Sequence, residues 1–394
     1  MAYRPGEFEL KKICFITTSS VTLKTFVMAT AEYLYRNGKY DITFVCNEDE
    51  KFRKFLPGYI HYKPIKMRRG MSLSGIRAIF SMVHFFKKEG FDFVQYATPN
   101  ASLYASIASK IAKIPIRQYG QWGIRYVGFR GIKRAVVKGL EKVVCRKSTH
   151  IYAASEKNKQ FSVREGLYTS EHAKVLGTGG TIGVSLDEFQ IEKKEEWGKE
   201  IREKYNFKDR FVFGFVGRIS RDKGSFELLS AFRKMVEKNG ALRLFMVGSE
   251  ETGAAFDRGI LNWAKKSDRV IFAGPVDTAD RAKYYAAIDV YLHPSHREGF
   301  GMAIQEAGAM GCAVVTTDIP GASEVLENGR SCLLVQPGEV SELEEKMHTL
   351  LNDESLCKKM GELARLRVEE HFERGRMLKL QFDEYERIFC EAKR

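Results

Sequence analysis

Short apolar runs, rich in β-branched and aromatic residues, alternate with longer stretches of helical periodicity along almost the whole chain. Such runs, bounded by turn residues, predict strands. In the first half of the chain they lie at 11–18, 41–47, 59–65, 92–97, 116–120, 150–155 and 174–179. In the second half they lie at 211–217, 242–248, 270–274, 289–294, 313–318 and 332–337. This alternation is typical of α/β folds, in which helices cover parallel sheets.

The strands form two sets, separated by a charged helical stretch, LDEFQIEKKEEWGKEIREKYNFKDR, and we place the linker near 180–195. A chain of 394 residues is long for one core. We expect one Rossmann-like domain over 1–190, a second over 191–372 and a C-terminal helix over 373–394, with a crossing back to the first domain as one possibility. Two such domains facing each other across a cleft are the simplest arrangement, with ligands beyond the carboxyl ends of the strands.

The composition argues against several classes of protein. No apolar run reaches the roughly 18 residues of a membrane span, and the first residues, MAYRPGEFELKK, contain no apolar signal-peptide core, so we do not expect export. The seven cysteines are scattered without a C-x-x-C pair, mostly in apolar runs. We therefore expect reduced, buried cysteines in a cytosolic protein and no structural zinc.

The net charge of +14 is concentrated in the first half of the chain. Residues 1–190 carry 31 Lys and Arg against 15 Asp and Glu, a balance of +16, whereas the remainder carries 33 against 35, a balance of −2. This asymmetry indicates an anionic partner for the first half, which nucleic acid, an anionic membrane surface or a phosphorylated lipid would satisfy. General solubility is the alternative explanation.

A first candidate site lies in FVFGFVGRISRDKGSFELLSAF, 211–232. A buried strand ends at Gly217 and a helix begins near Ser225, so Arg218 and Lys223 occupy a strand-to-helix loop beside a helix N-terminus. Free N–H groups, the helix dipole and two cations together favour a phosphate. The spacing is not that of a P-loop. A surface loop that simply carries basic residues is the alternative.

A second candidate site lies in HREGFGMAIQEAGAMG, 296–311. Glu298 is in the turn that follows a buried strand, and Glu306 is about one turn inside the next helix. Gly299 and Gly301 allow bare backbone N–H groups to point at a ligand. The two carboxylates suit acid and base chemistry, as in glycoside hydrolysis, and they equally suit hydrogen bonds to hydroxyl groups.

GRISRDKG followed by EGFGMAIQEAGAMGCAVVTTDIPGASEVL resembles the retaining family 4 glycosyltransferases of GT-B fold. The seven residues between the two glutamates, the Gly-Phe-Gly between them and the later Gly321-x-x-Glu324 stand in the family's order. The resemblance is tight over 211–340 and looser elsewhere. In the first half, LKTFVMATAEYL, QYATPNASLYASIASKIA and QWGIRYVGF resemble the branch that builds bacterial capsular polysaccharides and exopolysaccharides.

The resemblance implies a nucleotide-sugar donor, expected to be UDP-linked, in the second domain. Arg218 and Lys223, beside Gly217, would hold the diphosphate, and Glu306 would accept hydrogen bonds from the ribose. The donor sugar and its phosphates would lie against Glu298 and the backbone of Gly299, Phe300, Gly301 and Met302. The base would meet the backbone of Pro275 and Val276.

In the mechanism that the resemblance implies, the leaving diphosphate itself accepts the proton of the acceptor on the front face, so the anomeric configuration is retained. Arg218 and Lys223 would then act by stabilising the charge that develops on that phosphate. With Glu298 they are the expected catalytic residues.

The first domain is expected to bind the acceptor, with Ser19, Gln121, Trp122 and Arg125 as candidates. Many family members have a Gly-Gly loop after the first strand and a histidine after the fifth, where this chain has TTSS at 17–20 and Gln121. Glutamine cannot act as a base at neutral pH, which fits the leaving-group mechanism. Structural packing is the alternative role for Trp122.

Two basic amphipathic segments, 66–88 and 130–147, suit an anionic bilayer. Their expected membrane contacts are Arg68, Arg69, Lys133, Arg134 and Lys138. Ordinary domain helices with a solvated basic face are the alternative. We expect an enzyme peripherally associated with the cytoplasmic face of the cell membrane, with a polyprenyl-diphosphate-linked sugar as acceptor.

The predicted reaction transfers an N-acetylated hexosamine or deoxyhexosamine from a UDP-sugar, in capsule or other surface polysaccharide synthesis. We expect no metal, because D-x-D is absent and His293 and His296 flank a proline turn without an acid triad, and no cofactor beyond the donor substrate. The alternatives are a GT-B sugar-nucleotide epimerase, a phosphorylase, or a basic nucleic-acid-binding protein, for which the sequence has no recognised motif.

Overall fold

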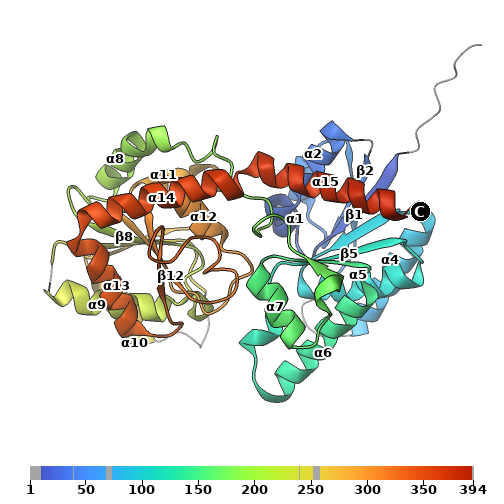
Figure 1. Cartoon of the computed structure of the whole chain (residues 1–394), viewed down its shortest axis with the longest axis horizontal. Coiled ribbons are helices and arrows are strands. Elements are labelled where there is room, and N and C mark those ends of the chain that lie inside the picture. The colour runs from blue at the N-terminus through green and yellow to red at the C-terminus, as the bar shows by residue number, and fades with distance from the viewer. Residues whose placement is uncertain (1–9, 39, 68–72, 239, 252–257, 393–394) are drawn as a thin grey trace, which may run out of the picture. The chain divides into compact units, whose positions relative to one another are not determined.

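The computed structural model describes residues 10–38, 40–67, 73–238, 240–251 and 258–392. The described residues within 1–182 and 377–394 form one compact unit (unit 1), and those within 183–376 form a second (unit 2), coloured along the chain in Figure 1. The divisions fall at 182/183 and 376/377, beside the predicted 190/191 and 372/373. The C-terminal helix α15 (Arg374–Ala392) contributes most of its length to unit 1.

Within its described residues, unit 1 contains a seven-stranded parallel sheet with the order β3-β2-β1-β4-β5-β6-β7. Its strands are β1 (Lys11–Ile16), β2 (Tyr40–Cys46), β3 (Ile60–Pro64), β4 (Phe93–Tyr96), β5 (Ile116–Gln121), β6 (His150–Ala153) and β7 (Ala173–Lys174). The strand order reverses between β1 and β4, which is the doubly wound Rossmann topology.

Alternate strand residues of unit 1 pack on opposite faces of the sheet. Ile13 and Phe15 of β1 belong to the core beneath α1 (Ser20–Phe26), α2 (Met28–Asn37), α3 (Glu50–Phe55) and α15. Cys14 and Ile16 belong to the core beneath α4 (Leu73–Glu89), α5 (Pro99–Ile111) and α6 (Gly131–Lys147). Figure 1 shows α15 with α1 and α2 on one side of this sheet and α4 to α6 on the other. The remaining helices of unit 1 are α7 (Glu156–Arg164), η1 (Arg125–Gly128) and η2 (Ser170–His172).

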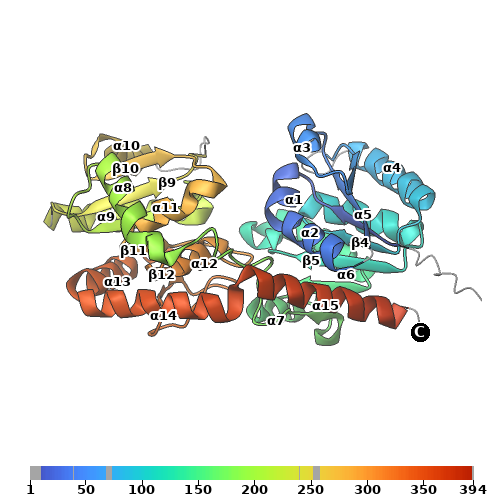
Figure 2. The same cartoon turned by 90° about the horizontal axis from the view of Figure 1, so that it is seen from above.

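The described part of unit 2 repeats the plan with a six-stranded parallel sheet of order β10-β9-β8-β11-β12-β13. Its strands are β8 (Val212–Val216), β9 (Arg243–Val247), β10 (Val270–Gly274), β11 (Val290–His293), β12 (Ala313–Thr317) and β13 (Leu333–Val335). Its helices are α8 (Lys194–Lys204), α9 (Ser225–Lys238), α10 (Arg258–Lys266), α11 (Arg281–Ala286), α12 (Met302–Ala309), α13 (Val340–Asn352) and α14 (Glu354–Phe372), with η3 (Ile191–Lys193), η4 (Arg221–Lys223) and η5 (Thr278–Asp280). Figure 2 shows α13 and α14 beside one another in unit 2.

The structure corrects one predicted strand. The run 174–179 forms only the two-residue strand β7, Ala173–Lys174. Gly177, Gly179 and Gly180 follow with φ angles of 54°, 110° and 108°, which a strand residue does not adopt. The chain therefore leaves the sheet after Lys174 as a glycine loop.

Candidate functional site

The candidate donor site of unit 2 lies where its strand order reverses. β8 pairs with β9 on one side and with β11 on the other. The loop after β8 carries Arg218 and Lys223, and the loop after β11 carries Glu298. In a doubly wound sheet a ligand binds beyond the carboxyl ends of the strands, at the point where the strand order reverses.

The two loops are in direct contact, and Gly224 makes this contact possible. Gly224 has a φ angle of 71°, and a Cβ atom there would come within 1.9 Å of the carbonyl oxygen of Pro294. A side chain at 224 is therefore excluded both by the left-handed backbone and by the neighbouring loop. The turn at Gly224 ends η4 and starts α9, so Lys223 is held next to the loop that carries Glu298.

The closest polar contact in this site joins Lys223 to Glu298. Lys223 Nζ lies 2.5 Å from Glu298 Oε1, and His293 Nε2 lies 2.7 Å from the same oxygen. A carboxylate oxygen is an acceptor, so both nitrogens donate to it. The ring of His293 is itself buried, and its Nδ1 lies 3.0 Å from the hydroxyl of Tyr291. Glu298 is thus held from two sides.

The surroundings of Glu298 keep it ionised. Burial disfavours the charged carboxylate, but the neighbouring His293 and Lys223 outweigh burial and bring the pKa of Glu298 far below its usual value. An ionised carboxylate cannot serve as a general acid at neutral pH. The site therefore favours a hydrogen-bond acceptor at this position over an acid.

Arg218 lies at the more exposed edge of the same loop. Its guanidinium is 3.2 Å from the Asp222 carboxylate and 3.3 Å from that of Glu251. Arg297, from the loop after β11, also reaches Asp222, at 2.9 Å. Exposed pairs of this kind contribute little free energy, so an incoming phosphate can replace Asp222 or Glu251 as the partner of Arg218.

Glu306 is buried on α12 and is paired with a residue that the sequence did not single out. Arg281 Nη1 lies 2.6 Å from Glu306 Oε1, and the hydroxyl of Tyr285 donates to Oε2 at 3.0 Å. Burial raises the pKa of Glu306, and the charge of Arg281 opposes that shift. Arg281 stands in PVDTADRAKYY, directly after the loop that is predicted to contact the base. This position is the feature of the sequence from which a role in donor binding could have been predicted for Arg281.

The glycine turn between the two glutamates is closely packed. Phe300 is buried against the ring of Phe372, at 5.4 Å between centroids. The N–H of Gly301 donates to the carbonyl of Gly321 at 2.9 Å, and the N–H of Gly321 donates to Glu324 at 2.9 Å. The later Gly-x-x-Glu segment thus supports the turn.

The remaining predicted donor residues flank these groups. Gly217 directly follows β8, and Gly299 and Met302 are half-buried on either side of Phe300. Val276 is half-buried in the loop after β10, and Pro275 beside it is exposed. β10 is two strands from β8, so the structure does not bring Val276 into contact with Lys223 and Glu298.

In unit 1 the strand order reverses between β1 and β4, and hydroxyl groups follow both strands. Thr18 Oγ1 lies 2.8 Å from Thr98 Oγ1, and Ser19 Oγ lies 3.0 Å from Thr22 Oγ1. Thr98 has a φ angle of 68°, which is strained for a β-branched residue. Ser19 is thus hydrogen-bonded to Thr22, and its neighbour Thr18 contacts Thr98, a residue that was not identified from the sequence.

The structure corrects the role expected for Gln121. Its side chain is fully buried, accepting from the hydroxyls of Ser162 and Tyr168 at 3.2 and 2.7 Å. Its amide nitrogen donates to Glu141 at 3.3 Å. A side chain so enclosed holds the domain together and does not meet an acceptor.

Trp122 and Arg125 remain at the surface of unit 1. Trp122 is half-buried, with its ring 5.5 Å from that of Phe26. Arg125 is half-buried, and its Nη1 lies 3.5 Å from Asn100 Oδ1 at the start of α5. Both side chains are accessible to a ligand.

Of the expected membrane contacts, Arg68 and Arg69 lie outside the described residues. Lys133 is exposed at the start of α6. Arg134 and Lys138 are half-buried and pair with Glu165, at 3.2 and 2.9 Å. Glu165 neutralises one of these two positive charges, and the predicted contact of Arg134 and Lys138 with a membrane stays a prediction.

Apolar side chains are exposed near Lys133. Ile132 is 85% exposed, and Val127 and Val136 are exposed as well. On α4 the structure exposes Phe80 and Ile76. These residues give the α4 and α6 side of unit 1 an apolar and basic surface.

The described residues contain neither a helix that could span a membrane nor a cluster of side chains that could hold a metal. None of the described helices is both long and apolar enough to cross a membrane. No group of three or more His, Cys, Asp or Glu side chains within the described ranges is arranged to hold a metal ion.

Two family models match the chain. Residues 198–367 match the model described as glycosyl transferases group 1, and residues 12–155 match the model described as glycosyl transferase 4-like. Together these models cover both units, including the loops after β8 and β11.

Curated relatives extend the similarity to nearly the full chain. The capsular polysaccharide biosynthesis glycosyltransferase CapM of Staphylococcus aureus is 32% identical over 92% of this chain and 93% of its own. The N,N'-diacetylbacillosaminyl-diphospho-undecaprenol α-1,3-N-acetylgalactosaminyltransferase of Campylobacter jejuni is 26% identical over 79% of this chain and 81% of its own. Both relatives transfer glycosyl groups.

Among solved structures, that of Anabaena HepE in complex with UDP-glucose is similar in fold. It superposes with a TM-score of 0.75 and 21% identity, over 95% of this chain and 98% of that protein. At this identity the match supports the shared fold.

Proposed function

We propose a specific reaction for this chain, which belongs to the family 4 glycosyltransferases of GT-B fold and to their capsular polysaccharide branch. It transfers a sugar, an N-acetylated hexosamine or deoxyhexosamine, from a UDP-sugar to a polyprenyl-diphosphate-linked sugar. The acceptor class is supported by the Campylobacter relative, whose name states a diphospho-undecaprenol acceptor. UDP as the donor nucleotide is supported by the UDP-glucose complex of HepE.

The observation that carries this proposal is the contact of Lys223 with Glu298 at the strand reversal of unit 2. The donor diphosphate lies between the loops after β8 and β11, where Lys223 and Arg218 bind its oxygens. Lys223 has three N–H donors, so it can keep Glu298 and still bind phosphate. Glu298, held ionised, accepts from a hydroxyl group of the donor sugar.

The ribose and the base of the donor extend from the diphosphate towards α12 and the loop after β10. Glu306 accepts from the ribose hydroxyls, and Arg281 holds its carboxylate in place. The backbone of Pro275 and Val276, after β10, meets the base. The N–H groups of the turn from Gly299 to Met302 line the donor sugar and its phosphates.

The transfer retains the anomeric configuration and needs no metal ion. The bond between the anomeric carbon and the diphosphate oxygen breaks, and the acceptor oxygen bonds to the same face of that carbon. The acceptor proton passes to the leaving diphosphate oxygen. Lys223 and Arg218 stabilise the negative charge that develops on that oxygen, a role for which cations fixed before the reaction are suited.

The acceptor is bound by unit 1, which meets the cytoplasmic face of the membrane. Ser19, Trp122 and Arg125 are its proposed contacts. Lys133 and the exposed apolar residues of α6 and α4 lie on the bilayer, where each cation adds about 1 kcal/mol near an anionic surface.

The experiment that tests this function is a donor screen. UDP-linked sugars are offered with a short-chain polyprenyl-diphosphate sugar, and release of UDP and the mass of the product are measured with and without EDTA. One UDP-sugar is expected to give product, with the α-linkage of the donor kept and with no loss in EDTA. Product of inverted configuration, or activity abolished by EDTA, contradicts the corresponding part of the proposal.

A further inference from the structure

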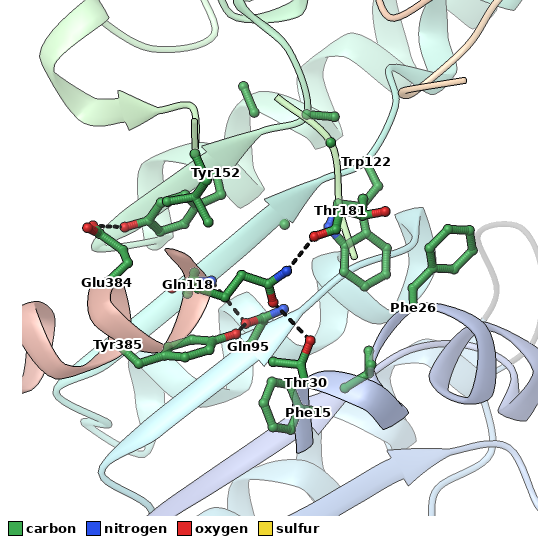
Figure 3. Close-up of a pocket in the computed structure, with 17 residues that line it drawn as sticks. Phe15, Phe26, Thr30, Gln95, Gln118, Trp122, Tyr152, Thr181, Glu384 and Tyr385 are labelled. Atoms are coloured by element: carbon green, nitrogen blue, oxygen red, sulfur yellow. Dashed lines mark hydrogen bonds between the residues drawn. The ribbon is translucent and has the colours of Figure 1, made fainter. Parts of the chain in front are cut away.

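Unit 1 contains a second polar site, a pocket between the sheet and α15 (Figure 3). Its buried floor is formed by residues of β1, β4, β5, β6 and α15, including Phe15, Gln95, Gln118 and Tyr385. Half-buried residues from α1, the loop after β5 and the loop before 182 complete it, among them Phe26, Trp122 and Thr181. The space is small, which suits one substituent of a sugar better than a whole ring.

Two glutamines lie side by side at the floor of this pocket. Gln95 of β4 and Gln118 of β5 are paired in register and occupy the strand positions that face α15. Their neighbours on the same face, Phe93 and Ile116, are apolar core residues. Buried amides at core positions are costly unless their hydrogen bonds are satisfied, so their presence calls for a reason.

The hydrogen bonds between the side chains of the floor leave one acceptor atom, Gln118 Oε1, without a donor among the described residues. Gln118 Nε2 donates to Gln95 Oε1 at 2.9 Å, and the hydroxyl of Tyr385 donates to the same oxygen at 2.5 Å. The side chain of Gln118 is 5% exposed, and its Oε1 has no hydrogen-bond partner among the described residues. An orphaned buried acceptor requires an N–H or O–H donor from outside the protein.

The hydroxyl protons around this acceptor are already engaged. The Tyr152 hydroxyl donates to Glu384, and Thr30 donates to Gln381 Oε1 at 2.9 Å. The donor for Gln118 Oε1 therefore has to enter the pocket.

The charges of the pocket are balanced. Glu384, which lines it, pairs with Lys174 at 2.7 Å and with Arg387 at 2.5 Å. These pairings and the Tyr152 hydroxyl overcome burial and lower the pKa of Glu384 to about 2. The carboxylate is thus neutralised on its own side, so the pocket offers nothing to attract a phosphate or an ammonium group. It suits a neutral ligand.

The walls of the pocket combine apolar and aromatic surface with one hydrogen-bond donor, the indole N–H of Trp122. Phe15, Val27 and Leu176 supply apolar contacts. Gly120 leaves room for the indole of Trp122, because a Cβ at 120 would lie 3.0 Å from Trp122 Nε1. A ligand here meets an amide acceptor, an indole N–H and an apolar wall.

We propose that this pocket binds the acetamido group of the acceptor sugar. The acetamido N–H donates to Gln118 Oε1, the methyl group packs against Phe15 and Leu176, and the carbonyl accepts from the indole N–H of Trp122. A sugar hydroxyl in place of the acetamido group would donate to Gln118 Oε1 but would make no contact with the apolar wall. The inference rests on the proposed function, since it names the class of acceptor that unit 1 selects.

The test is saturation-transfer NMR on the full chain with methyl N-acetyl-α-D-glucosaminide and methyl α-D-glucoside as probes. The acetyl methyl protons are expected to receive the strongest saturation, and the N-acetylated probe to bind about tenfold more tightly than the glucoside. Gln118→Met, which keeps the size of the side chain and removes the acceptor, is expected to abolish that preference. Gln160→Met, an exposed glutamine of α7 in the same unit, is the matched control and is expected to keep it.

UDP-induced thermal stabilisation is measured on the same samples, so failures can be told apart. A wild type that binds UDP but shows no acetyl saturation, or the same preference in Gln118→Met, overturns the acetamido pocket and leaves a site for water alone. A wild type that does not bind UDP overturns the proposed function instead. If Gln118→Met fails to fold, Trp122→Phe is used, which removes the indole donor and is expected to weaken the preference. An unchanged preference in that variant also counts against the proposal.

Discussion

Lys223 Nζ and Glu298 Oε1 lie 2.5 Å apart, although 75 positions separate the two residues in the chain. The contact is set by topology, because β8 and β11 are neighbours in the sheet and the loops that follow them meet at its carboxyl edge. The same arrangement brings His293 to Glu298 and leaves the cations of the site oriented before any ligand arrives. This preorganisation is the basis of the predictions for unit 2.

Replacing Lys223 with alanine is expected to lower kcat about a hundredfold, the usual scale for loss of a charge-stabilising group. Arg218→Ala is expected to act in the same direction. Initial rates of UDP release at saturating donor measure the effect. Lys234→Ala, on the exterior of α9, is the matched control. Turnover near that of the wild type in both site variants refutes their assigned role.

His293 is predicted to position Glu298 without touching the donor. His293→Ala removes the Nε2–H that Glu298 accepts, and we expect kcat to fall at least tenfold, since a hydrogen bond to a charged group contributes about 1.5–3 kcal/mol. His293→Gln retains an N–H of similar reach and should recover most of the rate. Equal kinetics in the alanine, glutamine and wild-type proteins would contradict the role, whereas a purely structural role predicts lower thermal stability with unchanged kcat.

Glu141 makes the stability of unit 1 depend on pH. Burial raises the pKa of its carboxyl group, and the hydrogen bonds from Tyr119 and Gln121 only partly oppose burial. Its contribution is therefore complete below the unfolded pKa near 4.5 and is lost as the pH rises through the folded pKa.

Glu141→Gln removes this penalty. We expect its Tm to exceed that of the wild type near pH 7 by about 2–4 °C, the shift that roughly 1 kcal/mol gives in a domain of this size. The gain should shrink to nothing near pH 4. Differential scanning fluorimetry across this range measures it, with the exposed Glu156→Gln as control. A gain that does not change with pH argues against a titrating Glu141.

The exposed end of α6 is predicted to contact anionic membranes. Ile132 and Lys133 are exposed there, and the double variant Ile132→Asp with Lys133→Glu is expected to reduce vesicle binding at least tenfold, because each lost cation costs about 1 kcal/mol. Flotation with vesicles containing phosphatidylglycerol measures binding at 0.05 and 0.5 M salt. Leu366→Asp, at an exposed apolar position of unit 2, is the control. The prediction fails if the double variant binds vesicles as tightly as the wild type and the Leu366→Asp control do.

Much of the fold could be predicted from the local spacing of apolar residues, because this spacing differs between buried strands and helices. The thirteen predicted strands correspond to β1–β13 of the described residues, although β13 covers only 333–335 of the predicted 332–337 and β7 is shorter still. Its apolar run suggested six residues, but the glycines at 177, 179 and 180 take the chain out of the sheet. Lys223 and Glu298 were also identifiable, since each follows a strong strand signal.

What sequence could not supply was pairing between distant residues. His293 ends a buried strand and gave no sign that its ring would face Glu298, which depends on how the following turn folds. Gln121 stands where many family members have a histidine. Its side chain points into the core, where it donates to Glu141 and accepts from the hydroxyl of Tyr168. Gln95 and Gln118 had a usable signal, as glutamines within buried strands, but only the sheet register places them together.

The central claim is that the loops after β8 and β11 bind the diphosphate of a UDP-sugar. Thermal stabilisation by UDP, GDP and ADP tests it most directly, in the wild type and in Lys223→Ala. A ligand at a hundred times its Kd stabilises the folded state by about 2.7 kcal/mol, so UDP should raise the Tm of the wild type clearly and that of the variant much less. If no nucleoside diphosphate raises the Tm of the wild type, or if Lys223→Ala responds equally, the claim is contradicted.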